Sequence, residues 1–371
     1  MNGRPQYRKQ SAALLRGQTE REHVVFTGRG ATAIWLALKA FGLVDHPVLI
    51  PANTCYIVLW AVLLSGNRPV LVDVDPVTGM ITPDTLTACG VERPGAVIPC
   101  HLYGLPAPMA AITAWARENG ARVIEDAALA FGNQVEGQPA GSWGDAAIFS
   151  FGTGKLVSFL SGGGALLTND AALATEARRL LSTLPRWTDQ LAALERQWLD
   201  IYWATHQHED ANPRIAELYP KLFELYNDIT LHQPDQFLYK ALVHSRIHME
   251  SNRKHRRDYS TRYDRLIGGS LHTIPRSDDA VLWRYPLLCP PELRDDLFER
   301  LLSWHVDATR WYPTLRPMVN ALAPQITQPP TPNADWFCAR IINLPLPIYD
   351  DPPDKTIKWI QERVQHWERY E

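Results

Sequence analysis

Short apolar runs alternate with helix-like segments between residues 24 and 170. The runs are rich in β-branched residues and do not alternate apolar with polar positions, which is typical of strands buried on both faces. The segments between them, such as 31–43 and 106–119, have helical spacing of their apolar residues. Strands that alternate with helices predict an α/β domain built on a mainly parallel sheet.

The rest of the chain has a different pattern. Residues 171–230 have helical spacing, and a long helix is predicted over 236–267, where it would connect two domains. Beyond it, a strand near 281–289 and helices over 291–305 and 354–370 predict a smaller α+β portion. We therefore predict a large domain over residues 1–240 and a small C-terminal domain over 241–371.

Composition and charge narrow the functional classes. A chain of 371 residues can bury a large core, and its net charge of -3 argues against general nucleic-acid binding. The basic stretch 252–262 is better explained as a solvated helix face than as a nucleic-acid site. The longest apolar run, 56–64, is shorter than the ~20 residues that a bilayer-spanning helix needs, so no membrane partner is expected.

The five cysteines are odd in number, scattered and without CxxC spacing. This usage favours a reducing compartment, and the N-terminus lacks an apolar core of signal-peptide length, so we predict a cytoplasmic protein. The polar stretch 206–210 contains several potential metal ligands, but they are crowded together on a predicted loop. We predict no metal site.

An acidic pair, Glu125 and Asp126, ends one of the predicted buried strands. Ligands bind at the carboxyl ends of strands in α/β sheets, and a buried carboxylate there needs a partner. The protonated ring nitrogen of a pyridine cofactor would be such a partner. Asp126 could instead cap the helix that the following residues predict, and these residues alone favour the cap.

A glycine-containing turn leads into the helix predicted from Ala31. The free N–H groups at a helix N-terminus bind phosphate, so Gly30, Ala31 and Thr32 form a candidate phosphate site. Many α/β proteins contain such a turn for purely structural reasons, and by itself it is a weak signal.

One lysine, Lys155, lies in a glycine-lined segment between two apolar runs. An amine attacks a carbonyl only when it is unprotonated, and burial lowers the pKa of a lysine. Ser150, five residues earlier, could bind a phosphate with its hydroxyl group. A surface lysine in a flexible loop is the alternative, but it does not explain the apolar runs on both sides.

The three segments together are more specific than any one of them. Their order resembles the fold-type-I pyridoxal-phosphate enzymes and, more closely, the DegT/StrS family of sugar aminotransferases. The motifs that carry the resemblance are GATA (30–33), VDVDP (72–76), HLYG (101–104), EDAALAFG (125–132) and FSFGTGK (149–155). The resemblance is clear over residues 24–170 and looser through the long helix and residues 301–313.

The resemblance implies an aspartate-aminotransferase-like fold and a ping-pong aminotransferase that uses pyridoxal 5'-phosphate. An amino acid such as glutamate would donate the amine, and a keto group, on a nucleotide-linked sugar or a cyclitol, would accept it. Lys155 would attach the cofactor and move the proton, Asp126 would pair with the ring nitrogen, and Ser150 with the amides of Ala31 and Thr32 would hold the phosphate. Family members are homodimers with active sites at the subunit interface.

Several positions depart from the family's pattern. Leu129 replaces a polar residue, Cys55 replaces the aromatic residue that stacks on the cofactor ring, and Ser161 replaces a glutamate. Of the element donated across the dimer, Asn227 is kept and the arginine is absent. Another pyridoxal-phosphate reaction on the same fold, or a non-catalytic binding or regulatory protein, therefore stays open as an alternative.

The segment 184–225 is longer and more aromatic than is usual in the family. It could lie over the mouth of the active site and help to determine the acceptor, because aromatic side chains suit the flat faces of a ring. Helical periodicity favours the other interpretation, in which these aromatics are the buried faces of two packed helices.

Overall fold

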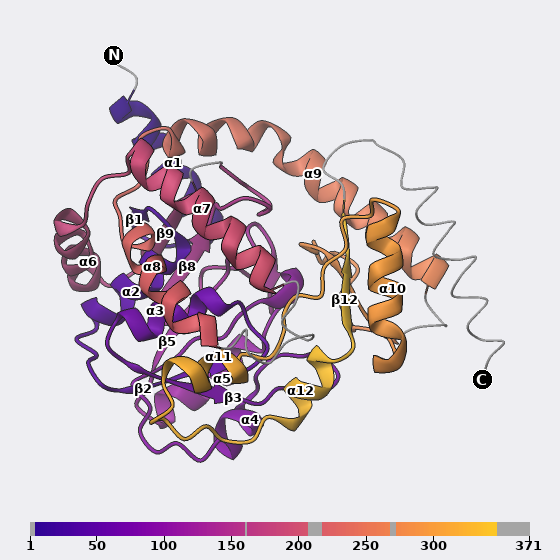
Figure 1. The fold of residues 1–371 in the computed structure, drawn as a ribbon. Helices are drawn as coiled ribbons and strands as arrows, with labels where there is room; N and C mark the ends of the chain where they lie inside the picture. The colour runs from indigo at the N-terminus through magenta and orange to yellow at the C-terminus, as the bar shows by residue number, and fades with distance from the viewer. Residues whose placement is uncertain (1–3, 160–161, 207–216, 268–271, 347–371) are drawn as a thin grey trace.

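The computed structural model describes residues 4–159, 162–206, 217–267 and 272–346. A sheet of seven strands lies at its centre (Figure 1). In spatial order the strands are β1 (His23–Thr27), β9 (Gly164–Thr168), β8 (Ala146–Ser150), β5 (Arg122–Asp126), β4 (Ala96–Val97), β2 (Pro47–Pro51) and β3 (Arg68–Val72).

The sheet is mostly parallel, as the continuous apolar runs predicted. The strands β8, β5, β4, β2 and β3 pair in parallel, while β9 pairs antiparallel with both β1 and β8. In the parallel register Asp126 lies opposite Ile148. Ser150, two residues further along β8, therefore ends its strand at the same edge of the sheet as Asp126.

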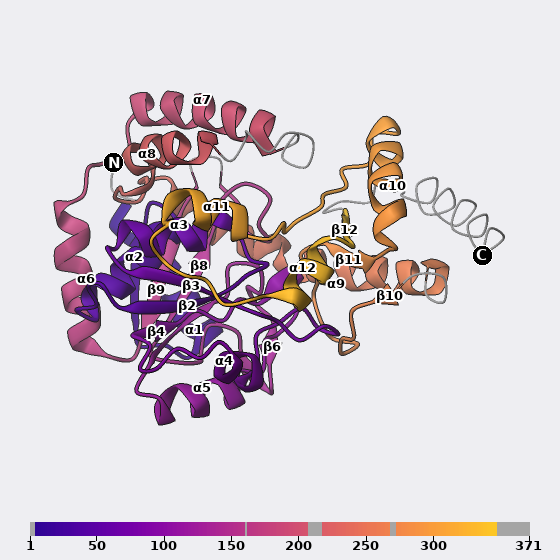
Figure 2. The same cartoon turned by 60° about the horizontal axis from the view of Figure 1, so that its bottom comes forward.

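Helices pack on both faces of this sheet, so the strands are almost completely buried. Figure 2 shows α4 and α5 on the side of the sheet opposite to α3, α7 and α8. The helices of this part are α1 (Arg4–Thr19), α2 (Gly30–Ala40), α3 (Tyr56–Leu64), α4 (Pro83–Ala88), α5 (Met109–Glu118) and α6 (Ala171–Thr183). The short elements are a 3-10 turn (Leu102–Gly104) and the hairpin of β6 (Gln134–Val135) and β7 (Gln138–Pro139).

Two further helices, α7 (Asp189–His206) and α8 (Tyr219–Thr230), pack against each other and lie along one side of the molecule (Figure 2). They come from the aromatic segment. The long helix α9 (Leu238–Ile267) follows, close to the bounds that the sequence predicts, and it packs on α1 before running out to the C-terminal part of the chain (Figure 1).

The C-terminal part contains a three-stranded antiparallel sheet of β10 (His272–Thr273), β11 (Tyr285–Leu288) and β12 (Ile341–Leu344). Its helices are α10 (Pro291–Ser303), α11 (Arg316–Leu322) and α12 (Pro332–Cys338). The predicted division at residue 240 stays a prediction, and the structure adds that the chain between α10 and β12 returns to the large sheet. Leu315 donates its N–H to the Ala52 carbonyl at 2.8 Å, and Ala334 donates to Asp73 at 2.8 Å.

The helix predicted over 354–370 lies outside the described residues. Within the described ranges, no helix is long and apolar enough to cross a membrane, and no group of side chains has the arrangement of a metal site. All five cysteines are free thiols. The cytoplasmic assignment is not tested by these features and stays a prediction.

Candidate active site

Asp126 ends β5 at the carboxyl edge of the sheet and is only 9% exposed. Its Oδ1 accepts the Ala128 N–H at 3.0 Å, so it does cap the following turn. Among the described residues, the hydrogen bond to Oδ2 is the weak one from the Sγ–H of Cys100, at 3.7 Å. Burial raises the pKa of this carboxyl group above its ordinary value. A cation placed against Oδ2 would stabilise the ionised form, and the protonated nitrogen of a pyridine ring fits that need.

Glu125 is the other member of the acidic pair, and both of its carboxylate oxygens have hydrogen-bond partners. Its carboxylate lies 2.9 Å from His101 Nε2 and accepts the N–H groups of Gly141 at 2.7 Å and Trp143 at 2.8 Å. The N–H of His101 donates to the carbonyl of Asp126 at 3.1 Å. These bonds fix the end of β5, so Glu125 and His101 position Asp126 from behind.

The start of α2 lies beside the end of β8. The first intrahelical bond runs from the Ala33 N–H to the Arg29 carbonyl at 3.2 Å, which leaves the amides of Gly30, Ala31 and Thr32 without an acceptor in the helix. A Cβ on Gly30 would lie 3.0 Å from the Cβ of Ser150, so glycine permits this close approach. A phosphate fits here, between the Ser150 hydroxyl and the helix N-terminus. Thr32 contributes only its amide, because its hydroxyl donates to the Thr230 carbonyl at 2.7 Å.

Lys155 follows a turn in which its N–H donates to the Gly152 carbonyl at 3.2 Å. The indole N–H of Trp283 donates to the Gly154 carbonyl at 2.7 Å and holds this loop against the C-terminal part of the chain. The Nζ of Lys155 lies 5.7 Å from the centre of the Trp283 ring. Burial lowers the pKa of the Lys155 ammonium group, although the nearby Cys55 and Asp126 oppose the shift, so the amine is easier to deprotonate than an exposed lysine.

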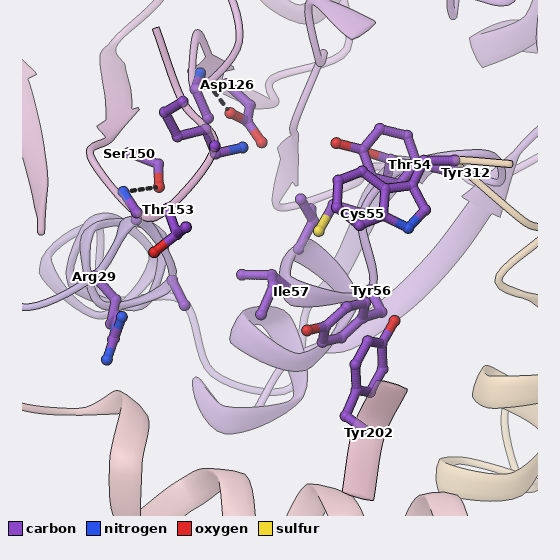
Figure 3. Close-up of a pocket in the computed structure, with 18 of the residues that line it drawn as sticks. Arg29, Thr54, Cys55, Tyr56, Ile57, Asp126, Ser150, Thr153, Tyr202 and Tyr312 are labelled. Atoms are coloured by element: carbon purple, nitrogen blue, oxygen red, sulfur yellow. Dashed lines mark hydrogen bonds between the residues drawn. The ribbon is translucent and has the colours of Figure 1, made fainter. Parts of the chain in front are cut away.

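These side chains surround a cavity of about 550 Å³ (Figure 3). The cavity brings together most of the residues predicted from the sequence: Gly30, Ala31, Cys55, Asp126, Ser150 and Lys155. Thr32 and Asn227 are not part of its lining, and Asn227 lies exposed on α8. Their cofactor-binding roles, like those of the lining residues, stay predictions.

Cys55 occupies the N-cap position of α3, where the family carries a ring-stacking aromatic residue. Burial raises the pKa of its thiol to about 11, so the thiol is neutral at neutral pH. The neighbouring Tyr56 does not replace the missing aromatic, because its ring packs on Tyr202 with centroids 4.3 Å apart. Figure 3 shows this pair below Cys55.

A column of aromatic rings from the C-terminal part forms one wall of the cavity, and the sequence did not identify it as part of the site. Trp283 and Trp311 stack with centroids 5.4 Å apart and parallel planes, and Tyr312 continues the column 6.0 Å from Trp311. The only signal in the sequence was the loose resemblance over residues 301–313, which does not extend to Trp283.

The aromatic segment forms another part of the wall. Trp198 and Tyr202 on α7 are buried, and both line the cavity. The indole of Trp198 donates to the Leu222 carbonyl of α8 at 2.9 Å and packs against Trp60 with centroids 5.5 Å apart. The two interpretations of this segment are therefore not exclusive: these aromatics are the packed faces of two helices and also a wall of the cavity.

Truncation of this wall should cost stability. Because Trp198 fills a space between α3, α7 and α8, we expect Trp198→Ala to lower the free energy of unfolding by ~3–5 kcal/mol. Denaturant titration would measure the loss, with Leu194→Ala as control, since Leu194 lies on the same helix and is 47% exposed. Equal stability of the two variants would show that α7 does not contribute to the core.

The fold and the cavity define a class of protein before any comparison. The edge of the α/β sheet carries a buried carboxylate, a helix N-terminus that can bind a phosphate, and a lysine whose pKa is lowered. These are the parts of a pyridoxal-phosphate site. Proteins of this class are enzymes that act on amines and carbonyl compounds.

The chain belongs to the DegT/DnrJ/EryC1/StrS aminotransferase family, whose model matches residues 7–189 and 240–365. This membership confirms the expected family, fold class and cofactor, and makes the chain a pyridoxal-phosphate-dependent aminotransferase. The segment between the two matched ranges contains α7 and α8. Apart from Asp189, these helices lie outside the matched ranges, and so does the part of the cavity wall that they supply.

Individual relatives match most of the chain. The chain is 27% identical over 373 residues to a pleiotropic regulatory protein of Geobacillus stearothermophilus, covering 98% of this chain and 90% of that one. It is 29% identical to the dTDP-4-dehydro-2,3,6-trideoxy-D-glucose 4-aminotransferase of Saccharopolyspora spinosa, over 93% and 85% of the two chains. The crystal structure of DesV from S. venezuelae superposes with a TM-score of 0.77 at 24% identity, over 96% and 89% of the chains.

Proposed function

We propose that this aminotransferase moves an amino group from an amino acid such as glutamate to the keto group of a nucleotide-linked sugar or a cyclitol in a ping-pong reaction. The observation that carries the proposal is the position of Lys155 and Asp126 in the lining of one cavity, with Ser150 and the start of α2 at its side. Pyridoxal phosphate, when bound, supplies an electron sink that makes the proton on the substrate carbon acidic.

The roles of the side chains follow from their chemistry. Lys155 would hold the cofactor through Nζ and would carry the proton, a task for which its lowered pKa suits it. Asp126 holds a proton on the ring nitrogen by pairing with it. Ser150 and the amides of Gly30, Ala31 and Thr32 bind the phosphate and so fix the orientation of the cofactor.

The visible spectrum of the purified protein tests this proposal. An absorption band of the protein-bound cofactor that glutamate bleaches, and that borohydride fixes to a peptide containing Lys155, is the expected result. If the protein binds the cofactor but no amino acid converts it to its amine form, the regulatory alternative is favoured. The similarity to a pleiotropic regulatory protein supports testing this alternative. Release of water or ammonia without net amino transfer would favour another pyridoxal-phosphate reaction.

We further propose that the protein is a cytoplasmic homodimer in which Asn227 serves the partner's site. The exposure of Asn227 on α8, outside the cavity of its own chain, supports this role. The dimer would then carry two active sites, each built from both subunits.

Subunit mixing tests the shared site. Lys155→Ala inactivates its own site, while Asn227→Ala should weaken the site of its neighbour. In a mixed dimer one site then contains both defects and the other contains none. Random exchange of equal amounts should therefore restore about a quarter of the wild-type sites. Activity that only averages the two parents would place Asn227 in its own subunit's chemistry or outside the site.

A further inference from the structure

The segment 281–283 of the C-terminal part is bonded at both ends to loops that follow strands of the large sheet. The Asn133 side chain donates to the Val281 carbonyl at 2.9 Å, and the Trp283 N–H donates to the Tyr103 carbonyl at 2.7 Å. Val281 is 2% exposed and Trp283 is 5% exposed, so water competes little for these bonds. The segment therefore has a defined position at the cavity.

Two further contacts fix the backbone of this segment. Gly104 has a φ of +91°, and a Cβ on it would lie 2.6 Å from the Val281 carbonyl oxygen, so glycine permits the close approach. From the other side, Nη1 of Arg256 on α9 donates to the carbonyls of Leu282 at 3.2 Å and Trp283 at 2.5 Å. The Trp283 side chain thus projects from a backbone that is bonded through both its N–H and its carbonyl.

The indole of Trp283 reaches the loop that carries Lys155. Its N–H donates to the Gly154 carbonyl at 2.7 Å, one residue before the lysine. Gly154 has a φ of +83°, which glycine adopts readily, and among the described residues no atom would lie within 4 Å of a Cβ there. Glycine is therefore required by the direction of the backbone and not by lack of space. That direction presents the carbonyl to the indole.

The ring of Trp283 also covers the amine. The Nζ of Lys155 lies 5.7 Å from the ring centre, at the outer limit of the ~6 Å range of cation–π attraction, so the ring stabilises the ammonium form only weakly. Its larger effect is to exclude water, and burial is the main cause that lowers the pKa of Lys155.

Other titratable groups also act on this amine. Three groups around the cavity oppose the lowering of the Lys155 pKa: Cys55, Asp126 and Cys100. The guanidinium of Arg284 lies 5.5 Å from the centre of the Trp283 ring. Substitution of Trp283 by another aromatic residue leaves all four of these groups in the chain, so its effect reports on the indole N–H and the cover.

We propose that Trp283 is a positioning residue for Lys155: its indole N–H fixes the loop through the Gly154 carbonyl, and its ring shields the amine from water. This inference rests on the proposed role of Lys155 and adds a residue of the C-terminal part to it. The C-terminal part, which supplies the aromatic column of the cavity, would then also determine how readily Nζ takes up and releases its proton.

Competitive acetylation of the cofactor-free protein tests the proposal without any need for turnover. Acetylation of Lys155 is followed by peptide mass spectrometry over a range of pH, with the exposed Lys254 as the reference in the same chain. Trp283→Phe keeps an aromatic ring but loses the indole N–H, so the freed loop should admit water to the amine. The midpoint of the Lys155 profile should then lie about one pH unit higher than in the wild type. An unchanged midpoint in the folded variant would overturn the proposal.

Trp336→Phe is the matched control. This tryptophan is 40% exposed on α12, outside the cavity lining, and the substitution removes the same indole N–H. Its Lys155 profile should coincide with that of the wild type. A shift as large as that of Trp283→Phe would show that the effect does not come from the bond to the loop, and would overturn the assignment.

Gly154→Ala tests the same bond from the side of the acceptor. The added Cβ disturbs the backbone of the turn without a clash, so the carbonyl should turn away from the indole and the midpoint should again rise. The double variant should shift the midpoint no further than the larger of the two single variants, because both substitutions remove one bond. Additive shifts would overturn the assignment. If Trp283→Phe does not fold, Gly154→Ala decides alone, and an unchanged midpoint overturns the proposal.

The reaction of the holoenzyme with glutamate separates this inference from the proposed function. Trp283→Phe should lower the rate of this half-reaction by about tenfold with little change in the glutamate concentration that gives half the maximal rate. If glutamate does not bleach the cofactor band of the wild type although the acetylation midpoints shift as expected, the positioning role of Trp283 is supported and the proposed function is rejected.

Discussion

Replacement of Lys155 by alanine should abolish covalent attachment of the cofactor and lower the rate of transamination by at least about 10⁴-fold. The variant should lose two functions at once, since the same Nζ is proposed both to attach the cofactor and to carry the proton. The substitution does not change the proposed phosphate site formed by Ser150 and the start of α2, so pyridoxal phosphate should still bind, but reversibly. Borohydride reduction followed by peptide mass spectrometry measures the attachment directly.

Lys254→Ala is a suitable control, because this lysine is exposed on α9 and pairs with Asp258 at 2.8 Å, remote from the cavity lining. It should keep the cofactor attached and the rate unchanged. A pyridoxyl group found on a lysine other than Lys155 in the wild-type protein would refute the assignment. Retained turnover in Lys155→Ala would do the same.

The core of the site could be predicted because its signals are local. Asp126 and Ser150 end buried strands, and Gly30 begins a helix, so the positions of all three can be predicted from the apolar runs and their ends. Parallel pairing then brings the strand ends to one edge of the sheet. The structure places all three residues in the lining of one cavity, as the apolar runs and their ends suggest.

The aromatic column could not be predicted in the same way. Trp283 meets Gly154 across 129 positions of sequence, and Trp311 stacks on Trp283 from a different loop of the C-terminal part. Periodicity reports which face of an element is buried, but it does not identify the partner of that face. For the same reason the pattern offered two exclusive interpretations of α7, although Trp198 serves both as core and as cavity wall.

The helix α1 was missed for a different reason. Its sequence is polar on average, with apolar residues mainly at Ala12, Ala13, Leu14 and Leu15, and it gives no strong helical stripe. Its position is determined by tertiary contacts, since it packs on α9 and the hydroxyl of Ser11 donates to the Tyr239 carbonyl at 2.8 Å. Most of the stability of such a helix comes from packing and not from its own sequence.

The second large effect concerns Asp126. We expect Asp126→Asn to lower the rate of the half-reaction with glutamate by about 10²–10³-fold, because an amide does not stabilise a protonated ring nitrogen as a carboxylate does. The amide oxygen can still accept the N–H of Ala128, so the cap of the turn is preserved. Stopped-flow absorbance of the cofactor measures this half-reaction without any acceptor, and a near wild-type rate would reduce Asp126 to a structural cap.

The same substitution should stabilise the protein once the cofactor is removed. Burial raises the pKa of Asp126 in the folded chain above its unfolded value, so the ionised carboxylate opposes folding. The stability associated with the protonated form is fully present below the unfolded pKa and is lost as the pH rises through the folded pKa. Asparagine does not ionise, so at pH 7 the cofactor-free variant should unfold at a higher denaturant concentration than the wild type, and this difference should shrink as the pH falls.

Bound pyridoxal phosphate should act against this difference in stability. In the wild type the protonated ring nitrogen would compensate the buried carboxylate, so cofactor binding would remove the cost in stability that Asp126 imposes on the empty site. The cofactor should therefore raise the melting temperature of the wild type more than that of Asp126→Asn. A cofactor-induced shift of equal size in both proteins, with the cofactor saturating, would show that Asp126 does not pair with the ring. A smaller shift in the variant, together with its greater stability in the cofactor-free state, would identify Asp126 as a residue whose buried charge is kept for its chemistry at the expense of stability.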